Sequence, residues 1–411
     1  MIKEYINLPR PLYVIIFAFM INSFGNFVRP FLTFLLTDKY GFSKDYTGFI
    51  VSLVTFIIVP GSLIGGRLVD TLGRKRIMII FHLISALCLI ICAFIEKPRL
   101  IIYLLLASSL SLSIASPGFN SMITDISKEE LRKTAFSLSY LGVNFGFALG
   151  SMIAGFLYKN YTKLLFLGNA ITTIIAMILI YFFVEETLPK KEDIKMLKLS
   201  PKESYEEGST LQALIKRPVL LAFGFIYIVF SLVYNQCAFA LPIHLNQLFN
   251  SEGAKLYGMV MALNAFTVVI FTPFINSFTE RYPSLFCVGI AGMLFAFGFG
   301  LNFFARVPWM FFISTFIWTL GEIIDAVNNR AFIAENSPVS HRGRFNSVMQ
   351  IIMGSGYTLS PYIAGKFLRN NSVETIWVYT FYLALLGSFM MFALNYYYCK
   401  GKLIKVEGEE V

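Results

Sequence analysis

Two carboxylates, Glu322 and Asp325, lie inside a long apolar run of the sequence. Three positions separate them, which places both on one side of a helix. Ionisable side chains are costly inside a bilayer, and those found there mark ion paths and proton relays. Burial favours the protonated form of a carboxyl group, so Glu322 first and Asp325 second are candidates for proton coupling. The alternative is that both are structural partners of a buried arginine or of the backbone.

This apolar run and three others carry further polar side chains, most of them at helical spacing. Such stripes indicate a face turned toward protein or water, because a lipid-facing helix surface has no use for polar groups. We expect nine of these residues to line a substrate cavity: Asn22, Asn26, Arg29, Ser113, Ser116, Asn120, Tyr234, Gln236 and Trp318.

Arg29 is a basic residue inside the first apolar run. On an ideal helix its depth differs from that of Glu322 by roughly 15 Å, so a resting salt bridge between them is not expected. A guanidinium in this place can hold a carboxylate or phosphate group of a substrate. It can also extend toward the interface or pair with another helix.

These residues require a scaffold within a membrane, and the composition indicates one. Of the 411 residues, 56% are hydrophobic and 14% are charged, whereas a soluble domain has roughly 25% charged residues. A hydrocarbon core about 30 Å thick needs about 20 apolar residues in a helix. The predicted fold class is all-α integral membrane, with twelve spans near 12–36, 47–66, 77–95, 100–123, 134–157, 164–184, 218–244, 256–277, 285–304, 309–329, 345–368 and 376–398.

The charge distribution sets orientation and excludes nucleic acid as a partner. The net charge is +10, but the Lys and Arg residues lie in short loops between apolar runs instead of forming one soluble basic domain. An inside N-terminus places most of them in inner loops, so both termini are expected in the cytoplasm of a multi-pass inner-membrane protein. A polar stretch predicts three parts: a six-helix bundle over 1–184, a cytoplasmic linker over 185–217 and a second bundle over 218–411.

An internal repeat relates the two predicted bundles. A shift of 210 residues aligns charged residues at helix borders, bringing Asp70 onto Glu280, Asp125 onto Glu335 and Arg132 onto Arg342. Such a repeat predicts two homologous halves about an axis along the membrane normal, with a substrate site between them near the midplane.

The loop after the second run reads GGRLVDTLGRKR over 65–76. Gly73 permits a tight turn there, and Gly66 is expected to let a neighbouring helix approach closely. The segment resembles the loop 2–3 motif of the major facilitator superfamily, and twelve helices with a 6+6 repeat resemble that family over the whole chain. The resemblance implies a conformational latch between the halves, formed by Gly66, Asp70, Gly73, Arg74, Asp125 and Arg132, in which Arg74 pairs with Asp125.

Two further segments bear on mechanism. The sequence from Thr319 to Ile323 resembles a segment of twelve-helix drug:proton antiporters, in which the Glu is implicated in proton coupling and in binding cationic substrates. The run from Gly142 to Gly155 resembles the antiporter motif of the family, but Ser151 and Ala154 stand where Pro and Gly are usual. Close helix packing explains these small residues equally well.

The sequence therefore predicts a secondary active transporter and not an enzyme. It would act as a monomer in the lipid bilayer, exchanging protons for lipophilic cationic compounds by alternating access, with the proton gradient as energy source and no cofactor or metal. One alternative is the same fold carrying a small organic anion or nutrient, with Arg29 holding the substrate. Another is a receptor or scaffold that transports nothing, which the intact 65–76 motif disfavours.

Overall fold

The computed structural model describes residues 8–128, 131–188, 217–336 and 342–409, and these residues form helices and connecting turns without a strand. Ten of their helical stretches are long and apolar enough to cross a membrane. The first half comprises α2 (Arg10–Phe24), α3 (Leu32–Phe34), the π-helical η1 (Leu35–Lys39), α4 (Lys44–Phe56), α5 (Ile58–Leu72), α6 (Arg74–Phe94), α7 (Pro98–Ile126), α8 (Arg132–Tyr158) and α9 (Thr162–Phe183). The second comprises α12 (Pro218–Tyr234), the 3₁₀ helices η3 (Asn235–Cys237) and η4 (Asn250–Glu252), α13 (Ala240–Phe249), α14 (Gly253–Thr279), α15 (Ser284–Leu301), α16 (Pro308–Asn336), α17 (Arg342–Phe367) and α18 (Val373–Glu409).

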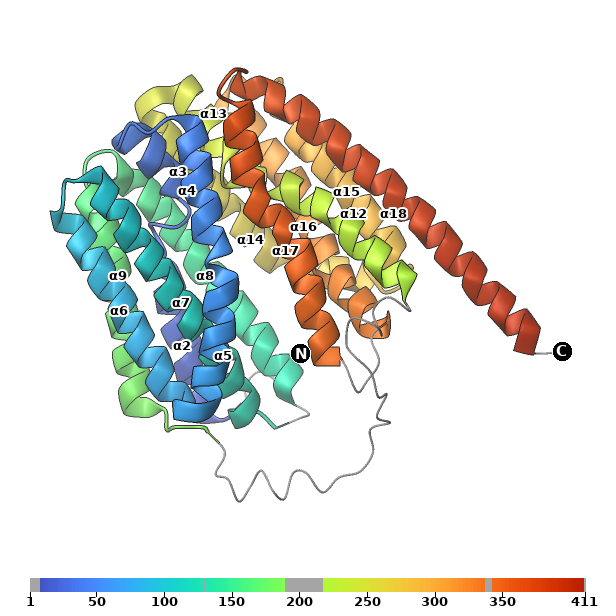
Figure 1. Cartoon of the computed structure of the whole chain (residues 1–411), viewed down its shortest axis with the longest axis horizontal. Helices are drawn as coiled ribbons and strands as arrows, with labels where there is room; N and C mark the ends of the chain where they lie inside the picture. Colours follow the sequence, from blue (N-terminus) through green and yellow to red (C-terminus); the bar gives the residue numbers. More distant parts are fainter. Residues whose placement is uncertain (1–7, 129–130, 189–216, 337–341, 410–411) are drawn as a thin grey trace. The chain divides into compact units, whose positions relative to one another are not determined.

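The structure bears out an all-α membrane fold (Figure 1). Its helix boundaries repeat at the predicted offset. Helix α7 begins at Pro98 and α16 at Pro308, and both helices have 29 residues. Helices α6 and α15 begin at Arg74 and Ser284, again 210 positions apart. A proline in the first turn suits a helix start, because the missing N–H has no partner there in any case.

The chain divides into two compact units. Unit 1 contains the helices up to α9 and also residues 241–269, which include most of α13 and the first part of α14. Unit 2 contains α12, the end of α14 and α15 to α18.

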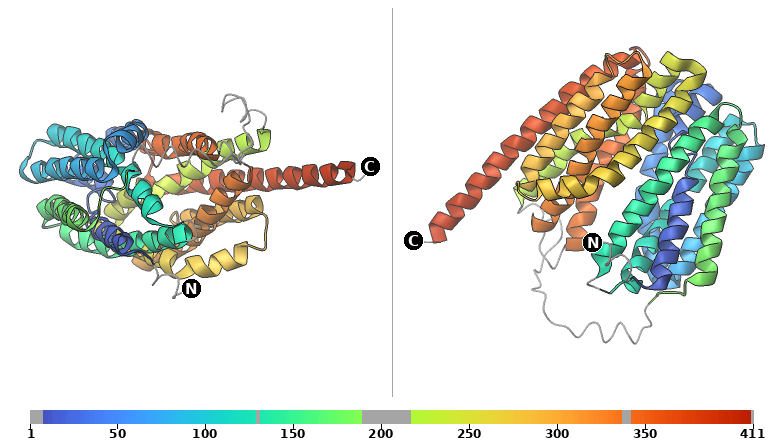
Figure 2. Two further views of the ribbon diagram at one scale, coloured as in Figure 1. Left: turned by 90° about the horizontal axis from the view of Figure 1, so that it is seen from below. Right: turned by 180° about the vertical axis from the view of Figure 1, so that it is seen from behind.

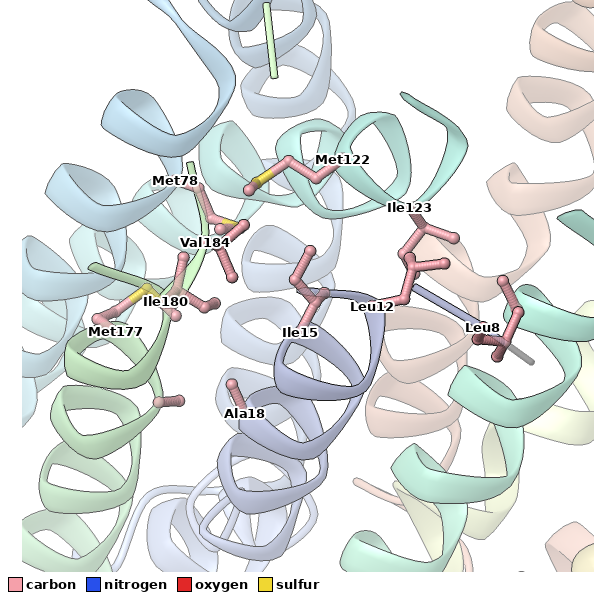
Figure 3. Packing of buried hydrophobic residues seen from close by; sticks show 12 residues of the cluster. Leu8, Leu12, Ile15, Ala18, Met78, Met122, Ile123, Met177, Ile180 and Val184 are labelled. Carbon is pink, nitrogen blue, oxygen red and sulfur yellow. The ribbon is translucent and has the colours of Figure 1, made fainter. Parts of the chain in front are cut away.

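The core of unit 1 is an apolar cluster among α2, α6, α7, α8 and α9 (Figure 3). Leu12 and Ile15 of α2 contribute to it, together with Met78, Met122 and Ile180 from three other helices. All five side chains are buried.

Small residues on α8 allow close contact with two neighbours. A Cβ added at Gly146 or Gly150 would lie 2.3 or 2.0 Å from a carbonyl oxygen of α2. One added at Gly155 would lie 2.9 Å from the carbonyl oxygen of Ala254 in α14. The stripe therefore packs helices, as the packing interpretation expected.

Unit 2 is built around α15, which packs against α16 and α18, while α12 packs against α17 and α18. Figure 2 shows α18 running beside α15. Phe299 of α15 stacks on Trp318 of α16 and on Trp377 of α18, with ring centroids 5.3 and 6.2 Å apart. Both tryptophans are fully buried, so this stack fixes the positions of three helices.

The first span is not one continuous helix, contrary to our prediction for 12–36. Helix α2 ends at Phe24, and residues 25–31 form turns before α3 begins. Gly25 and Pro30 cause the break, because glycine favours a helix end and proline clashes with the carbonyl of the residue four positions earlier. A side chain at Gly25 would also collide with Thr172.

The seventh span is broken at the matching place. Helix α12 ends at Tyr234, 210 residues after the end of α2, and a 3₁₀ turn and two further residues precede α13. Pro242 lies in the first turn of α13, where it costs no helical hydrogen bond. Helices broken at corresponding positions of two halves point to a binding site.

Candidate functional site

Glu322 and Asp325 of α16 lie in a cluster of tyrosines within unit 2. The Tyr227 hydroxyl of α12 donates a hydrogen bond to Asp325 Oδ2. Tyr234, two turns further along α12, interacts electrostatically with the Glu322 carboxylate. Tyr357 of α17 interacts electrostatically with both acids. We call these five residues the carboxyl–tyrosine cluster.

Two buried oxygens beside the cluster lack a hydrogen-bond donor among the described residues. They are Oδ1 of Asp325 and Oδ1 of Asn329, one helical turn apart on α16. Asp325 is 8% exposed and Asn329 is 9% exposed. A buried acceptor without a donor costs free energy unless water, a proton or a cation satisfies it. The arrangement can therefore accept a positive charge.

The two acids differ in access. Asp325 is buried, whereas Glu322 is only partly buried. Beside Glu322, the rings of Tyr234 and Tyr357 pack against each other, with their centroids 6.0 Å apart. Glu322, which is partly exposed among aromatic rings, can contact a ligand. The more deeply buried Asp325 can exchange protons with Glu322.

Trp318 is fully buried in the stack with Phe299, so it holds α16 in place and is not exposed to a cavity. The Tyr234 ring packs against it in a T-shaped arrangement, with ring centroids 5.8 Å apart. Its place in the stack corrects our expectation of direct cavity lining, because a large aromatic ring gains more from packing than from water.

Gln236 lies in the break of the seventh span and binds the neighbouring helix. Its Nε2 donates to Ser360 Oγ at 2.9 Å, and the Ser360 hydroxyl in turn donates to the Leu232 carbonyl at 2.8 Å. Asn235 donates to the Tyr357 carbonyl at 2.8 Å. The bond to the Leu232 carbonyl satisfies a backbone group that the break frees, and the bonds to Ser360 and Tyr357 tie the break to α17. Gln236 Oε1 has no hydrogen-bond partner in the described chain.

The first span presents Asn26 and Arg29 on the irregular segment, not at helical spacing on one helix face. Asn169 of α9 stabilises this segment by accepting the Val28 N–H at 3.5 Å. The Arg29 side chain is exposed, and it makes no hydrogen bond or ion pair with any residue described. Asn22, on α2, accepts a hydrogen bond from Thr173 at 2.8 Å, so it also joins α2 to α9.

The polar stripe of α7 divides between two faces. Ser116 and Asn120 are exposed on the same side, consistent with an aqueous face. Ser113 is buried against Gly61 of α5, and its hydroxyl donates to the Leu110 carbonyl at 2.8 Å. The prediction that Ser113 lines a cavity is therefore wrong, because its side chain packs against α5.

The predicted latch loop contains the expected ion pair. Arg74 Nη1 binds the Asp125 carboxylate and also donates to the Ser121 carbonyl at 3.2 Å. Arg132 donates through Nε to the Thr124 carbonyl at 3.4 Å, near the same end of α7. Asp70 is exposed and pairs with none of the described residues.

The two glycines of the loop behave differently. Gly73 has φ +111°, a conformation that side-chain-bearing residues rarely adopt, so the turn requires glycine. A Cβ on Gly66 would meet nothing within 4 Å, so the prediction that Gly66 allows close approach is wrong. Gly65 does so instead, since its added Cβ would lie 2.2 Å from the Ile114 carbonyl oxygen. Adjacent helical residues point about 100° apart, and only one of them can face α7.

Glu186 is a residue that our sequence analysis missed. Its carboxylate accepts the backbone N–H groups of Arg74, Lys75 and Arg76 at 2.8, 3.3 and 3.4 Å, at the N-terminus of α6. Partial burial opposes ionisation, but these N–H donors and that of Leu188 outweigh it and lower the pKa of Glu186. The only sequence signal was an acidic pair after an apolar run, and its partner lies over a hundred residues away.

Among the described residues, no group of three or more His, Cys, Asp or Glu side chains could hold a metal ion. The carboxyl–tyrosine cluster has two carboxylates and uncharged neighbours, which suits a proton or a monovalent cation better than a divalent metal, because divalent sites combine more oxygen ligands.

Comparison with known proteins identifies the family. The model of the Major Facilitator Superfamily matches residues 14–254 and 237–409. A Na(+), Li(+), K(+)/H(+) antiporter of Planococcus maritimus is 21% identical over 366 residues, covering 84% of this chain and 86% of its own. The 3-(3-hydroxy-phenyl)propionate transporter of Escherichia coli is 29% identical over 159 residues, covering 37% of this chain and 38% of its own.

Solved structures show the same fold. A POT family transporter in complex with a thioalcohol-conjugated peptide has a TM-score of 0.78 at 14% identity, covering 94% of this chain and 96% of its own. The nucleoside transporter NupG, solved as a point mutant, has a TM-score of 0.74 at 16% identity, covering 93% of this chain and 99% of its own.

Proposed function

Since this chain belongs to the major facilitator superfamily and is a membrane transporter rather than an enzyme, we propose that it exchanges protons for a monovalent cation. The observation that carries the proposal is the carboxyl–tyrosine cluster on α16. Glu322 and Asp325 form a pair of acids within a span, flanked by hydroxyl donors and by buried oxygens that lack donors. A proton and a cation competing for these acids give exchange, because loading either one releases the other.

Two kinds of cation fit different parts of the cluster. The faces of Tyr234 and Tyr357 beside Glu322 suit a lipophilic organic cation through cation–π contact, as the resemblance to drug:proton antiporters implies. The free oxygens of Asp325 and Asn329 suit an alkali metal ion. The similarity to a Na(+), Li(+), K(+)/H(+) antiporter supports the second class.

Arg29 supports a second candidate function, transport of an organic anion. Its guanidinium is exposed in the break of the first span and has no partner in the described chain, so it is available to a substrate carboxylate. Relatives include a gallate transporter of Pseudomonas putida, 24% identical over 194 residues, which covers 45% of this chain and 43% of its own. In this alternative the two acids carry the protons of a symporter.

We further infer that the chain works as a monomer in the inner membrane, with both termini in the cytoplasm. Basic loops at one membrane face support this orientation. The transport halves would be 1–184 and 218–411, joined by 185–217, with the latch residues controlling their alternation.

Transport assays in proteoliposomes test the proposed function. Vesicles with an acidic interior are monitored with a pH-sensitive dye while Na+, K+, a lipophilic cation or an aromatic carboxylate is added outside. We expect a cation to dissipate the gradient with wild type and with Glu335→Gln, a control at the exposed end of α16, but not with Glu322→Gln. A response to the carboxylate alone, lost in Arg29→Gln, would establish the anion transporter instead.

A further inference from the structure

A cavity of about 670 Å³ opens at the end of unit 1 that lies opposite Arg74. It lies among the ends of η1 and α6, the start of α7 and the turn from α8 to α9. Its volume is within the range of small-molecule sites. None of the residues discussed for proton coupling or the latch lines it.

The rim of this cavity is positively charged. Lys39, Lys159 and Lys163 line it, against one acid, Glu96. Lys39 and Lys163 form no ion pair with any residue that the structure describes, and Lys159 makes only a distant pair with Glu252, at 3.9 Å.

The acid next to Lys39 in the chain, Asp38, forms no ion pair with it in the described structure. Asp38 lines a smaller adjoining cavity, which Lys39 and Lys159 also line, and its carboxylate accepts hydrogen bonds from Tyr158 and Asn246 at 3.0 and 3.2 Å. The three lysines outnumber Asp38 and Glu96 together, so the rim keeps a net positive charge.

The N-terminus of α9 adds to the positive potential. Thr162 and Lys163 of its first turn line the cavity, and no side chain caps the helix. The free N–H groups and the helix dipole there favour an anion. Two unpaired ammonium groups and an uncapped helix start thus face one cavity.

The wall below the rim is apolar. Cys92, Ala93, Ile95 and Phe166 form it, and Tyr40 and Tyr161 lie nearer the opening. Inorganic phosphate would leave this wall uncovered, whereas an amphiphile would cover it. The cavity also lies where spans end, which is the depth of phospholipid head groups and of interfacial tyrosines.

We propose that this cavity binds the head group of an anionic phospholipid, with the phosphate diester held by Lys39, Lys159 and Lys163 and the first acyl carbons against the apolar wall. Glu96 accepts a hydrogen bond from a hydroxylated head group such as glycerol. The net positive rim selects against zwitterionic lipids. This site is independent of the proposed proton exchange.

The test is native mass spectrometry of the purified full-length chain in detergent, titrated with phosphatidylglycerol, phosphatidylethanolamine or phosphatidylcholine. We expect tighter retention of phosphatidylglycerol, and a loss of roughly fivefold per lysine in a Lys39→Gln/Lys163→Gln double variant. The matched control is Lys97→Gln/Arg99→Gln, which removes two charges from exposed residues at the same end that do not line the cavity. Unchanged unfolding temperatures in lipid-free detergent confirm that the variants fold.

Equal retention of all three lipids would overturn the proposal, and so would equal loss in the control pair, which would mean unspecific attraction. A competition experiment with soluble glycerol phosphate distinguishes a lipid from a soluble anion. If it competes at the same concentration as phosphatidylglycerol, the cavity is a site for a soluble anion and the lipid assignment is wrong.

Discussion

At the scale of single residues, three carboxylates of the described chain have uncharged polar neighbours in place of a basic side chain. Asp325 accepts a hydrogen bond from a tyrosine hydroxyl, Glu322 lies beside a second tyrosine, and the exposed Glu186 accepts hydrogen bonds from backbone N–H groups. A neutral donor stabilises a carboxylate without fixing it as a permanent salt bridge does. Acids held in this way can still give up their charge to a proton or a cation.

Glu186 provides a residue-scale prediction. Glu186→Gln should lower the apparent free energy of unfolding by about 1 kcal/mol, the usual worth of a capping side chain. Glu185→Gln is the control, since the exposed Glu185 makes no hydrogen bond or ion pair with a described residue. Thermal unfolding in detergent at pH 7 measures both, and equal shifts would contradict the capping role.

The difference in stability between wild type and Glu186→Gln should depend on pH with a definite sign. The folded pKa of Glu186 lies below its ordinary value of 4.5. Its contribution is therefore complete above the unfolded pKa and disappears as the pH falls through the folded pKa. The gap in unfolding temperature between wild type and Glu186→Gln should persist at pH 7 and 6 and narrow below about pH 4.5. A gap that widens on acidification would refute this assignment.

At the scale of elements, the helices could be predicted and their breaks were overlooked. Apolar length predicted the spans, because burial in lipid demands about 20 residues regardless of tertiary contacts. Gly25 and Pro30 were visible in the sequence as signals of a break, yet the spacing of Asn22, Asn26 and Arg29 was interpreted as one helix. The partners that stabilise the breaks, Asn169 and Ser360, come from distant helices and cannot be read from spacing.

The candidate site, like the helices, could be predicted from the sequence only in part. Glu322 and Asp325 stood out because an acid inside an apolar run is rare. Tyr227 and Tyr357 did not, because tyrosines are common throughout this chain and only the fold shows which of them meet the acids. Trp318 and Ser113 were misplaced because a polar or amphipathic residue can face a packed neighbour as readily as a cavity.

The close contact between α2 and α8 leads to a prediction about stability. Gly150→Ala places a methyl group 2.0 Å from the Phe24 carbonyl oxygen, so α2 and α8 must separate. We expect a loss of roughly 1–3 kcal/mol in stability, despite the better helix propensity of alanine. Gly354→Ala in α17 is the control, because nothing lies within 4 Å of its added Cβ. It should unfold at the same temperature as wild type or higher; a drop as large as that of Gly150→Ala would contradict the packing argument.

At the scale of the whole molecule, the residues proposed for cation binding and those proposed for alternation lie in different units. The acids that we propose exchange cations lie in unit 2, while the Arg74–Asp125 pair lies in unit 1. Asp125→Asn removes the charge that Arg74 binds and should slow turnover in proteoliposomes by roughly tenfold, as expected for loss of about 1.4 kcal/mol of stabilisation in one conformational state. Cation binding to the purified protein should be unchanged. Loss of binding together with turnover would show that the pair is not a latch.

The proposed exchange requires a proton and a cation to compete for Glu322. The measurement that tests it most directly is proton release from detergent-purified protein in weak buffer on addition of alkali cations, lipophilic cations and small organic anions. We predict release with a cation from wild type and from Glu335→Gln, and none from Glu322→Gln. Release that persists in Glu322→Gln, or a response to anions but to no cation, would contradict the account.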